Sequence, residues 1–565
     1  MKTPSRAACS DMTRRTLLAR AATAGVSAAA LDLTAQMRAA AAPIPSGPTS
    51  VVAAQGTPAN EVAPSGQIIL ARNLSELSTL HPFVARFTSA LAVAYHVNEG
   101  LTKFAPDFGV TPGLASEWTV SDDQLTFTFT LRQGVTWHDG EPFTANDVLF
   151  TIEAAGAEDS EAAAQETVRT YIASVEAPDD ATVVITLTEP YSPLLTVLAE
   201  QLTILPAHLL AENVYDEAFA LMPVGTGPYR VTGREASFIT LEHNPDYWGE
   251  LPYTDTIILR DSPEPAAQQA GLLAGELDVV PYDPTTMANL TGQGYAVFRG
   301  QAGSVHGINI DLQSPLLQDL NIRQALQLGL DRERIRSVLY AEGIIADTVV
   351  SPAYGEYHND AMPEIARDVE AAGALLDASG WVLGDDDVRQ KDGQPLTIQY
   401  QAWASQQWQN IAAIAQASWL EIGVNAEIQN VELALLVDTM SSRYELATVG
   451  WPLTSDPIVG LAQLFQSTDR TLADGGTRNV FGYKNEQVDA LLAEAFATTE
   501  LADRVAVAHQ IQEIVAADLP FIPFAHPAYQ LVTQPEIVLD ETGTGALSSI
   551  GPGFFMNRWR VNEDS

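Results

Sequence analysis

Apolar and polar side chains alternate over residues 125–131. Leu125, Phe127, Phe129 and Leu131 fall on one side of an extended backbone, and threonines fall on the other. This period of two predicts a strand with one buried face. Shorter apolar runs predict further strands at residues 67–71, 182–187, 238–241 and 256–259.

In the second half of the chain, apolar positions recur at helical spacing. Residues 321–330 show this pattern, and Asp331 is a candidate N-cap for a second helix with Ile335, Val338 and Leu339 on its apolar face. Further helices are predicted at residues 364–379, 410–421, 487–496 and 503–517.

Two strand-like segments, residues 396–400 and 424–428, flank the predicted helix 410–421. A strand, a helix and a strand in this order predict a crossover unit with parallel strands. Strands and turns dominate the first half and helices the second, and the crossover unit is typical of the α/β fold class. A chain of 565 residues also exceeds what a single hydrophobic core organises, which predicts two or more lobes.

The charge balance is strongly acidic. The chain carries 29 Lys and Arg against 71 Asp and Glu, a formal net charge of −42. Such a surface repels phosphate groups and anionic lipids, so we expect no nucleic-acid or membrane-surface partner. Solubility, including solubility in a salty medium, accounts for the charge without implying a cationic ligand.

The N-terminus predicts an export signal. Arg14 and Arg15 lie in the pattern TRRTLL, a weakly apolar stretch follows at residues 21–31, and small residues at 39–42 offer a cleavage site. We therefore expect a twin-arginine signal peptide at 1–42 and a flexible leader at 43–65. Cys9 precedes the arginines, so we expect neither a lipid anchor nor a thiol in the mature chain.

The chain offers little catalytic chemistry. None of the four lysines follows a glycine, which excludes a P-loop. Gly225 and Gly227 begin like a dinucleotide fingerprint, but the residues after them predict a tight turn and a strand. Nucleophile-elbow and paired-histidine motifs are missing from the sequence, so we expect no catalytic residue, no metal site and no cofactor.

Four segments then occur in order. They are residues 114–148 (LASEWTVSDDQLTFTFTLRQGVTWHDGEPFTANDV), 224–230 (VGTGPYR) with 244–248 (NPDYW), 321–326 (NIRQAL) with 330–333 (LDRE), and 375–381 (LLDASGW). In these segments the chain resembles the family 5 extracellular solute-binding proteins, the dipeptide-, oligopeptide- and nickel-binding group of ABC importers. The resemblance extends from about residue 66 to residue 560.

The resemblance implies a periplasmic-binding-protein type II fold with two hinged lobes and an accessory domain. Domain I would comprise residues 66–108, 222–305 and 524–560, the accessory domain II residues 109–221, and domain III, the second lobe, residues 306–523. The lobes would close on a ligand by hinge bending. The implied partners are a peptide or small-molecule ligand and permease subunits with cytoplasmic ATPases. We expect a soluble extracytoplasmic monomer that is not an enzyme.

Candidate ligand-binding residues follow from the same resemblance. Peptide-binding members have an aspartate after a Gly-Trp pair that anchors the peptide's α-amino group. Here residues 450–457 read GWPLTSDP, so Thr454 occupies the anchor position, and Asp456 either replaces the anchor or caps the next turn. The predicted ligand-binding residues are Trp451, Asp456, Thr454, Trp403, Ser405, Gln406, His81 and Phe83.

The sequence leaves the ligand open. A peptide is the leading hypothesis, and the Thr454 departure keeps a non-peptide solute such as an oligosaccharide, an opine or a metal complex as the alternative. His138 is predicted to be a turn residue, because Asp139 and Gly140 follow it. Trp408 and Trp419 are predicted to pack in the core.

Overall fold

The computed structural model describes residues 63–561, apart from residues 86–87, 105–109, 288, 341–342, 455, 469–478 and 540–555. All described residues belong to one compact unit. The predicted signal peptide and nearly all of the leader lie outside the described residues. Within the described part of the chain, none of the helices combines the length and apolar character needed to cross a bilayer.

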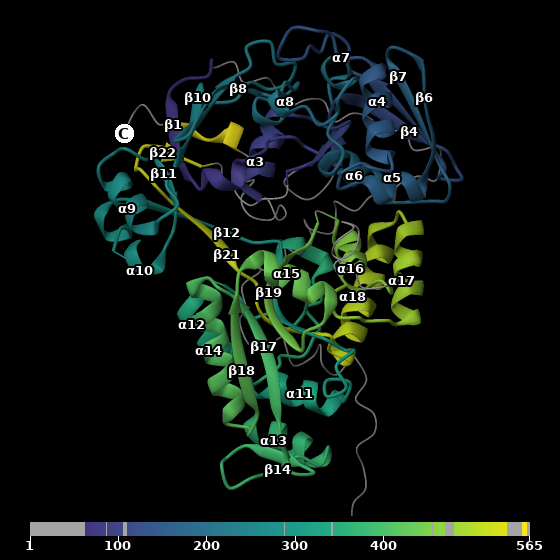
Figure 1. The fold of residues 1–565 in the computed structure, drawn as a ribbon. Coiled ribbons are helices and arrows are strands. Elements are labelled where there is room, and N and C mark those ends of the chain that lie inside the picture. The colour runs from purple at the N-terminus through teal and green to yellow at the C-terminus, as the bar shows by residue number, and fades with distance from the viewer. Residues whose placement is uncertain are drawn as a thin grey trace, which may run out of the picture. The chain divides into compact units, whose positions relative to one another are not determined.

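A seven-stranded sheet forms the first layer (Figure 1). Its central strand β1 pairs in parallel with β10 and β11, and the other pairs are antiparallel. In spatial order the strands are β12 (Ala296–Gln301), β21 (Ala528–Thr533), β11 (Val279–Pro281), β1 (Gln67–Arg72), β10 (Thr256–Asp261), β9 (Phe238–His243) and β8 (Tyr229–Glu235). The helices in this part of the chain are α3 (Thr88–Val97), α9 (Pro265–Leu273) and α10 (Pro284–Met287).

A four-stranded antiparallel sheet is built from a continuous stretch of chain. Its strands are β4 (Ala115–Val120), β5 (Thr126–Leu131), β7 (Thr182–Leu187) and β6 (Ile172–Asp179), in that spatial order. Its helices are α4 (Ala145–Gly156), α5 (Gln165–Tyr171), α6 (Leu194–Glu200), α7 (Ala207–Leu210) and α8 (Glu217–Leu221). A short pair, β2 (Thr102–Phe104) with β3 (Val110–Pro112), precedes it.

A five-stranded sheet carries the helix-rich second half. Its strands are β18 (Asn425–Val431), β17 (Thr397–Trp403), β19 (Leu446–Pro452), β13 (Ser304–Ile310) and β20 (Phe521–Ala525). Its helices are α11 (Leu320–Gly329), α12 (Arg332–Leu339), α13 (Val369–Ala378), α14 (Gln406–Leu420), α15 (Leu433–Ser442), α16 (Pro457–Phe465), α17 (Glu486–Ala497) and α18 (Leu501–Asp518). Two small sheets are also present, one of β14 (Val382–Leu383), β15 (Arg389–Lys391) and β16 (Gln394–Pro395), and one of β22 (Ile537–Val538) with β23 (Arg560–Val561).

The chain passes between the large sheets twice, at neighbouring positions. β12 ends at Gln301 and β13 begins at Ser304, while β20 ends at Ala525 and β21 begins at Ala528. β12 pairs with β21, and β13 pairs with β20. The two crossings therefore run side by side, as Figure 1 shows where β12 and β21 approach β19. The domain boundaries inferred above stay a prediction.

Most elements predicted from periodicity are confirmed. β5 buries Phe127, Phe129 and Leu131 as the alternation requires. β17, α14 and β18 form the predicted crossover, because the two strands pair in parallel. α11 and α12 follow one another, and Asp331 caps α12 by accepting from the Arg334 N–H at 2.9 Å.

Three local predictions are wrong. α13 begins at Val369 and not at residue 364, because the Asp368 side chain accepts from the Ala371 N–H at 2.8 Å and starts the helix there. α14 begins at Gln406, four residues before the predicted start. Val338 was predicted on the apolar face of α12 but is 57% exposed, because the buried face of this short helix carries Arg332 and Ile335.

Candidate ligand-binding site

Six of the eight predicted site residues gather at one edge of the five-stranded sheet. β17 and β19 are parallel neighbours, so their carboxyl ends reach the same edge. β13 runs antiparallel to β19 and pairs Ser304 with Pro452, so the chain enters the sheet at this edge from the crossing. Ligands in open α/β sheets commonly bind beyond the carboxyl ends of the strands. We call residues 450–457 the β19 loop and residues 403–406 the β17 loop.

In the β19 loop, Trp451 and Thr454 are held by protein contacts. Trp451 is buried and pairs with Val305, and its indole Nε1 donates to Asn309 Oδ1 at 2.9 Å. Thr454 is also buried, and its hydroxyl donates to the Asp456 carbonyl at 2.7 Å. These contacts hold the two side chains in place. A role in ligand contact stays a prediction for both residues.

Asp456 is the N-cap of α16 and belongs to a buried ion pair. Its Oδ1 accepts from the Ile458 N–H at 2.9 Å, and its Oδ2 lies 2.5 Å from Arg504 Nη2 on α18. Burial alone would lower the pKa of Arg504, but the Asp456 carboxylate together with Tyr357 and Tyr191 raises it overall. Tyr357 places its ring 5.9 Å from the guanidinium. The capping interpretation of Asp456 is confirmed, and its charge is already neutralised.

The β17 loop is more open. Trp403 is half-buried, with its ring centroid 6.5 Å from that of Trp408. Ser405 stands at the N-cap of α14 without a capping hydrogen bond from its side chain. Gln406 is exposed and donates to Asn410 Oδ1 at 2.9 Å. An aromatic face and nearby polar groups suit a ligand with both apolar and hydrogen-bonding parts.

His81 and Phe83 lie in another part of the structure and are fully buried. His81 Nε2 lies 2.8 Å from the Val214 carbonyl, so Nε2 donates, and Nδ1 accepts from the Phe83 N–H at 3.1 Å. Their ring contacts include Phe219 at 5.3 Å from His81. Desolvation by burial lowers the pKa of His81. Both residues pack the core here, and their contact with a ligand stays a prediction.

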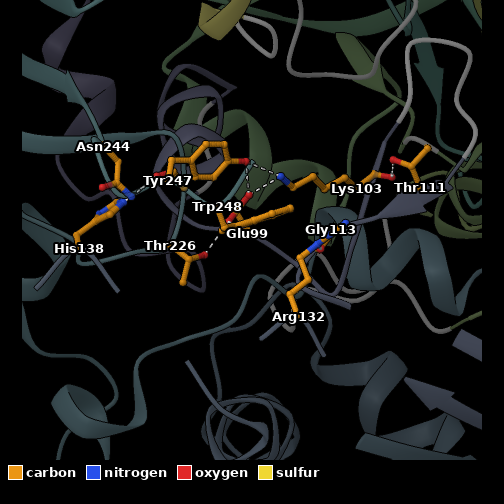
Figure 2. A network of polar contacts seen from close by, with 11 residues as sticks. Glu99, Lys103, Thr111, Gly113, Arg132, His138, Thr226, Asn244, Tyr247 and Trp248 are labelled. Carbon is orange, nitrogen blue, oxygen red and sulfur yellow. Dashed lines mark hydrogen bonds and ion pairs between the residues drawn. The ribbon is translucent and has the colours of Figure 1, made fainter. Parts of the chain in front are cut away.

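A second polar centre, which the sequence reasoning missed, surrounds Glu99 (Figure 2). The buried carboxylate accepts from Tyr247 Oη, Trp248 Nε1 and Thr226 Oγ1 at 2.8, 2.8 and 2.9 Å, and it forms an ion pair with Lys103. Lys103 and Arg132 lie over the Trp248 ring, at 4.4 and 4.3 Å from its centroid. Glu99, Lys103, Tyr247 and Trp248 line a cavity of about 280 Å³.

The Glu99 network joins family segments that are distant in sequence. Thr226 belongs to the segment 224–230, and Tyr247 and Trp248 belong to 244–248. A Cβ on Gly225 would lie 1.8 Å from the Val97 carbonyl oxygen, so only glycine allows this turn to approach α3 so closely. His138 donates from Nε2 to the Gly227 carbonyl at 3.0 Å and accepts from the Gly225 N–H at 3.1 Å. The predicted role of His138 as a turn residue is confirmed.

Comparisons with known proteins agree with this architecture. A sequence model of the bacterial extracellular solute-binding proteins, family 5 Middle, matches residues 109–471. Protein XP55 of Streptomyces lividans is 29% identical over 503 residues, 86% of this chain and 89% of that protein. The dipeptide-binding protein of Escherichia coli strain K12 is 28% identical over 458 residues, 74% of this chain and 81% of that protein.

A similar solved structure is NikZ from Campylobacter jejuni in complex with Ni(L-His), which is 26% identical and has a TM-score of 0.76. The superposition covers 88% of this chain and all of that one. The molecule is thus a substrate-binding protein of the ABC-transporter class with the type II periplasmic-binding-protein fold. The chain belongs to the family 5 bacterial extracellular solute-binding proteins, as its resemblance predicted.

Proposed function

We propose that this chain captures a small solute between its two lobes outside the cytoplasm and delivers it to an ABC permease without chemical change. The main support is that the β17 and β19 loops lie at the sheet edge where both crossings enter. A ligand held there touches one lobe directly and meets the other when the lobes close, so ligand binding favours closure.

A peptide is the leading ligand. The named function of the Escherichia coli relative, a dipeptide-binding protein, supports this choice. The β17 loop would supply Trp403 as an apolar wall and Ser405 and Gln406 as polar contacts, while the backbone of the β19 loop would face the same space. His81 and Phe83 would contact the ligand only after their packing in the core rearranges.

One observation favours a non-peptide solute as the second candidate. A carboxylate that anchors a peptide's ammonium group has to be free to accept from it, but Asp456 already pairs with Arg504 at 2.5 Å. Thr454, at the anchor position, is neutral and donates its hydroxyl within the loop. A solute without an essential ammonium group, such as an oligosaccharide, an opine or a metal complex, needs no such anchor.

Export by a twin-arginine signal at residues 1–42, with a soluble, unanchored monomer as the product, is part of the same proposal. Its support is the residue pattern around Arg14 and Arg15. Expression with Arg14→Lys and Arg15→Lys together would retain the protein in the cytoplasm if the twin-arginine route is used. Unchanged export of this variant would contradict that route.

The ligand proposal is tested by thermal unfolding against separate panels of peptides, oligosaccharides, opines and nickel complexes. A true ligand at 100 times its dissociation constant stabilises the fold by about 2.7 kcal/mol. Trp403→Ala should abolish the ligand-induced shift, whereas Trp381→Ala, beside the small sheet β14–β16, should retain it. Mass spectrometry of the recovered ligand tests catalysis, because a binding protein returns it unchanged.

A further inference from the structure

The loop between β7 and α6 contacts a helix of the five-stranded-sheet part. The Ser192 N–H donates to the Phe496 carbonyl at 2.7 Å, and the Ser192 hydroxyl donates to the Ala495 carbonyl at 3.2 Å. Both carbonyls belong to the last turn of α17, where carbonyls lack the regular partners of the helix interior. The Ala495 carbonyl also accepts from the Thr498 N–H at the C-cap. A residue 303 positions earlier in the sequence thus satisfies the end of this helix.

Aromatic rings reinforce the same contact. Tyr171 and Tyr191 stack with centroids 4.0 Å apart, and the Tyr191 ring lies 5.4 Å from that of Phe496. Tyr191 and Phe496 are both buried. Aromatic pairs at these separations add to the stability that their buried area provides. Two hydrogen bonds and an aromatic cluster therefore join the four-stranded-sheet part to α17.

This contact lies near the β19 loop. Burial raises the pKa of the Tyr191 hydroxyl. The Asp456 carboxylate raises this pKa further, and Arg504 lowers it. Asp456 and Arg504 form the buried ion pair at the start of α16. Tyr191 therefore lies within electrostatic reach of this ion pair.

We propose that Tyr191 and Ser192 form a clasp on the C-terminal end of α17 that stabilises the closed arrangement of the protein. The proposal rests on the proposed function, because only a hinged binding protein has an open arrangement to oppose. The crossings join the lobes covalently and persist in both arrangements, whereas the clasp must break when the lobes open. It therefore sets part of the open–closed equilibrium through protein groups alone.

Hydrogen exchange on the full chain tests the clasp without a ligand. Ser192→Ala removes the hydrogen bond from the hydroxyl to the Ala495 carbonyl. It should raise the rate of amide exchange in the loop between β7 and α6 by about fivefold, the effect of one neutral hydrogen bond. Phe496→Ala removes the ring that packs against Tyr191. It should raise amide exchange in the same loop by about tenfold or more. Small-angle scattering should show a larger radius of gyration for both variants.

Two matched controls separate the clasp from general loosening. Ser116→Ala removes a comparable hydroxyl bond, to the Thr130 carbonyl at 3.1 Å, within the four-stranded sheet. Leu492→Ala truncates another buried side chain of α17. Both controls should leave exchange around residue 192 and the radius of gyration unchanged.

Unchanged exchange and scattering in Ser192→Ala and Phe496→Ala, with circular dichroism confirming the fold, would overturn the clasp. Equal changes in the two controls would overturn it as well, because the effect would then be unspecific. Neither result depends on a ligand. Failure of every solute panel would count against the proposed function instead, so the two failures remain distinguishable.

Discussion

The ion pair between Asp456 and Arg504 carries a stability prediction because both side chains are withdrawn from water. Their exposed fractions are 3% and 13%, and Arg504→Met would leave the carboxylate buried and unpaired. We expect the free energy of unfolding to fall by about 3 kcal/mol. Urea unfolding followed by circular dichroism measures this change.

The exposed pair of Arg367 and Glu421, at 2.8 Å, provides the matched control. Water solvates these charges already, so Arg367→Met should cost less than about 1 kcal/mol. Equal losses from the two substitutions would show that burial does not govern the strength of these pairs.

His138 carries a prediction about pH. Burial lowers its pKa from 6.5 to about 4, because the charged ring would lose its hydration. The neutral ring accepts from the Gly225 N–H through Nδ1, which a protonated ring could not do. Between these values the unfolded chain binds more protons than the folded chain. The free energy of unfolding should therefore fall as pH drops from about 6.5 to 4, by up to about 1.4 kcal/mol per pH unit from this residue.

His138→Gln should remove that part of the slope, measured by urea unfolding across the pH range. Thr226→Val weakens the same turn by deleting the hydrogen bond to Glu99 but removes no titrating group. It should lower stability at every pH and keep the slope. A slope that is identical in His138→Gln and in the unaltered chain would contradict the prediction.

Some residue roles could be predicted because their cause is local. His138 was predicted from the Asp-Gly turn that follows it, and Asp456 from its place before Pro457. The partners of these residues could not be predicted in the same way. Arg504 lies 48 positions from Asp456, and Glu99 lies 127 positions from Thr226, so only the folded chain brings them together.

At the scale of an element, the start of α4 depends on Asp147. Its Oδ2 accepts from the Thr144 N–H at 2.9 Å, and its Oδ1 accepts from the Ala207 N–H at 3.0 Å. Asp147→Ala leaves these donors without an acceptor in a buried place. The free energy of unfolding should fall by about 2 to 4 kcal/mol in urea titrations.

Asp368 offers the comparison, because it caps α13 at an exposed site with a single bond to the Ala371 N–H. Asp368→Ala should cost about 1 kcal/mol. If both substitutions cost the same, the bond from Asp147 to Ala207 contributes nothing to stability.

Periodicity predicts the interior of an element better than its ends. The alternation in β5 and the spacing in α11 extend over several residues and fix the element type. The start of α13 depends on one side chain, Asp368, that competes with neighbouring residues for the N-cap position, whereas Ser405 at the N-cap of α14 makes no capping hydrogen bond. A sequence pattern cannot settle that competition, since tertiary contacts also decide which residue caps.

At the scale of the whole molecule, the pairing of strands was beyond local sequence reasoning. β1 pairs with β10, about 190 residues later, and β12 pairs with β21, about 230 residues later. The family resemblance supplied the fold class, which is confirmed. The resemblance also identified the β17 and β19 loops as candidate ligand-binding loops. It did not predict that the Asp456 carboxylate of the β19 loop pairs with Arg504.

The acidic charge gives the last prediction, which concerns the molecule as a whole. A net charge of −42 makes the folded chain repel itself, and folding brings those charges closer together. Salt shortens the reach of this repulsion from about 10 Å at 0.1 M to about 3 Å at 1 M. The free energy of unfolding in urea should therefore rise when sodium chloride increases from 0.05 to 0.5 M, and equally with potassium chloride. Stability that falls with either salt would mean that the ion pairs, such as Arg504 with Asp456, outweigh the repulsion.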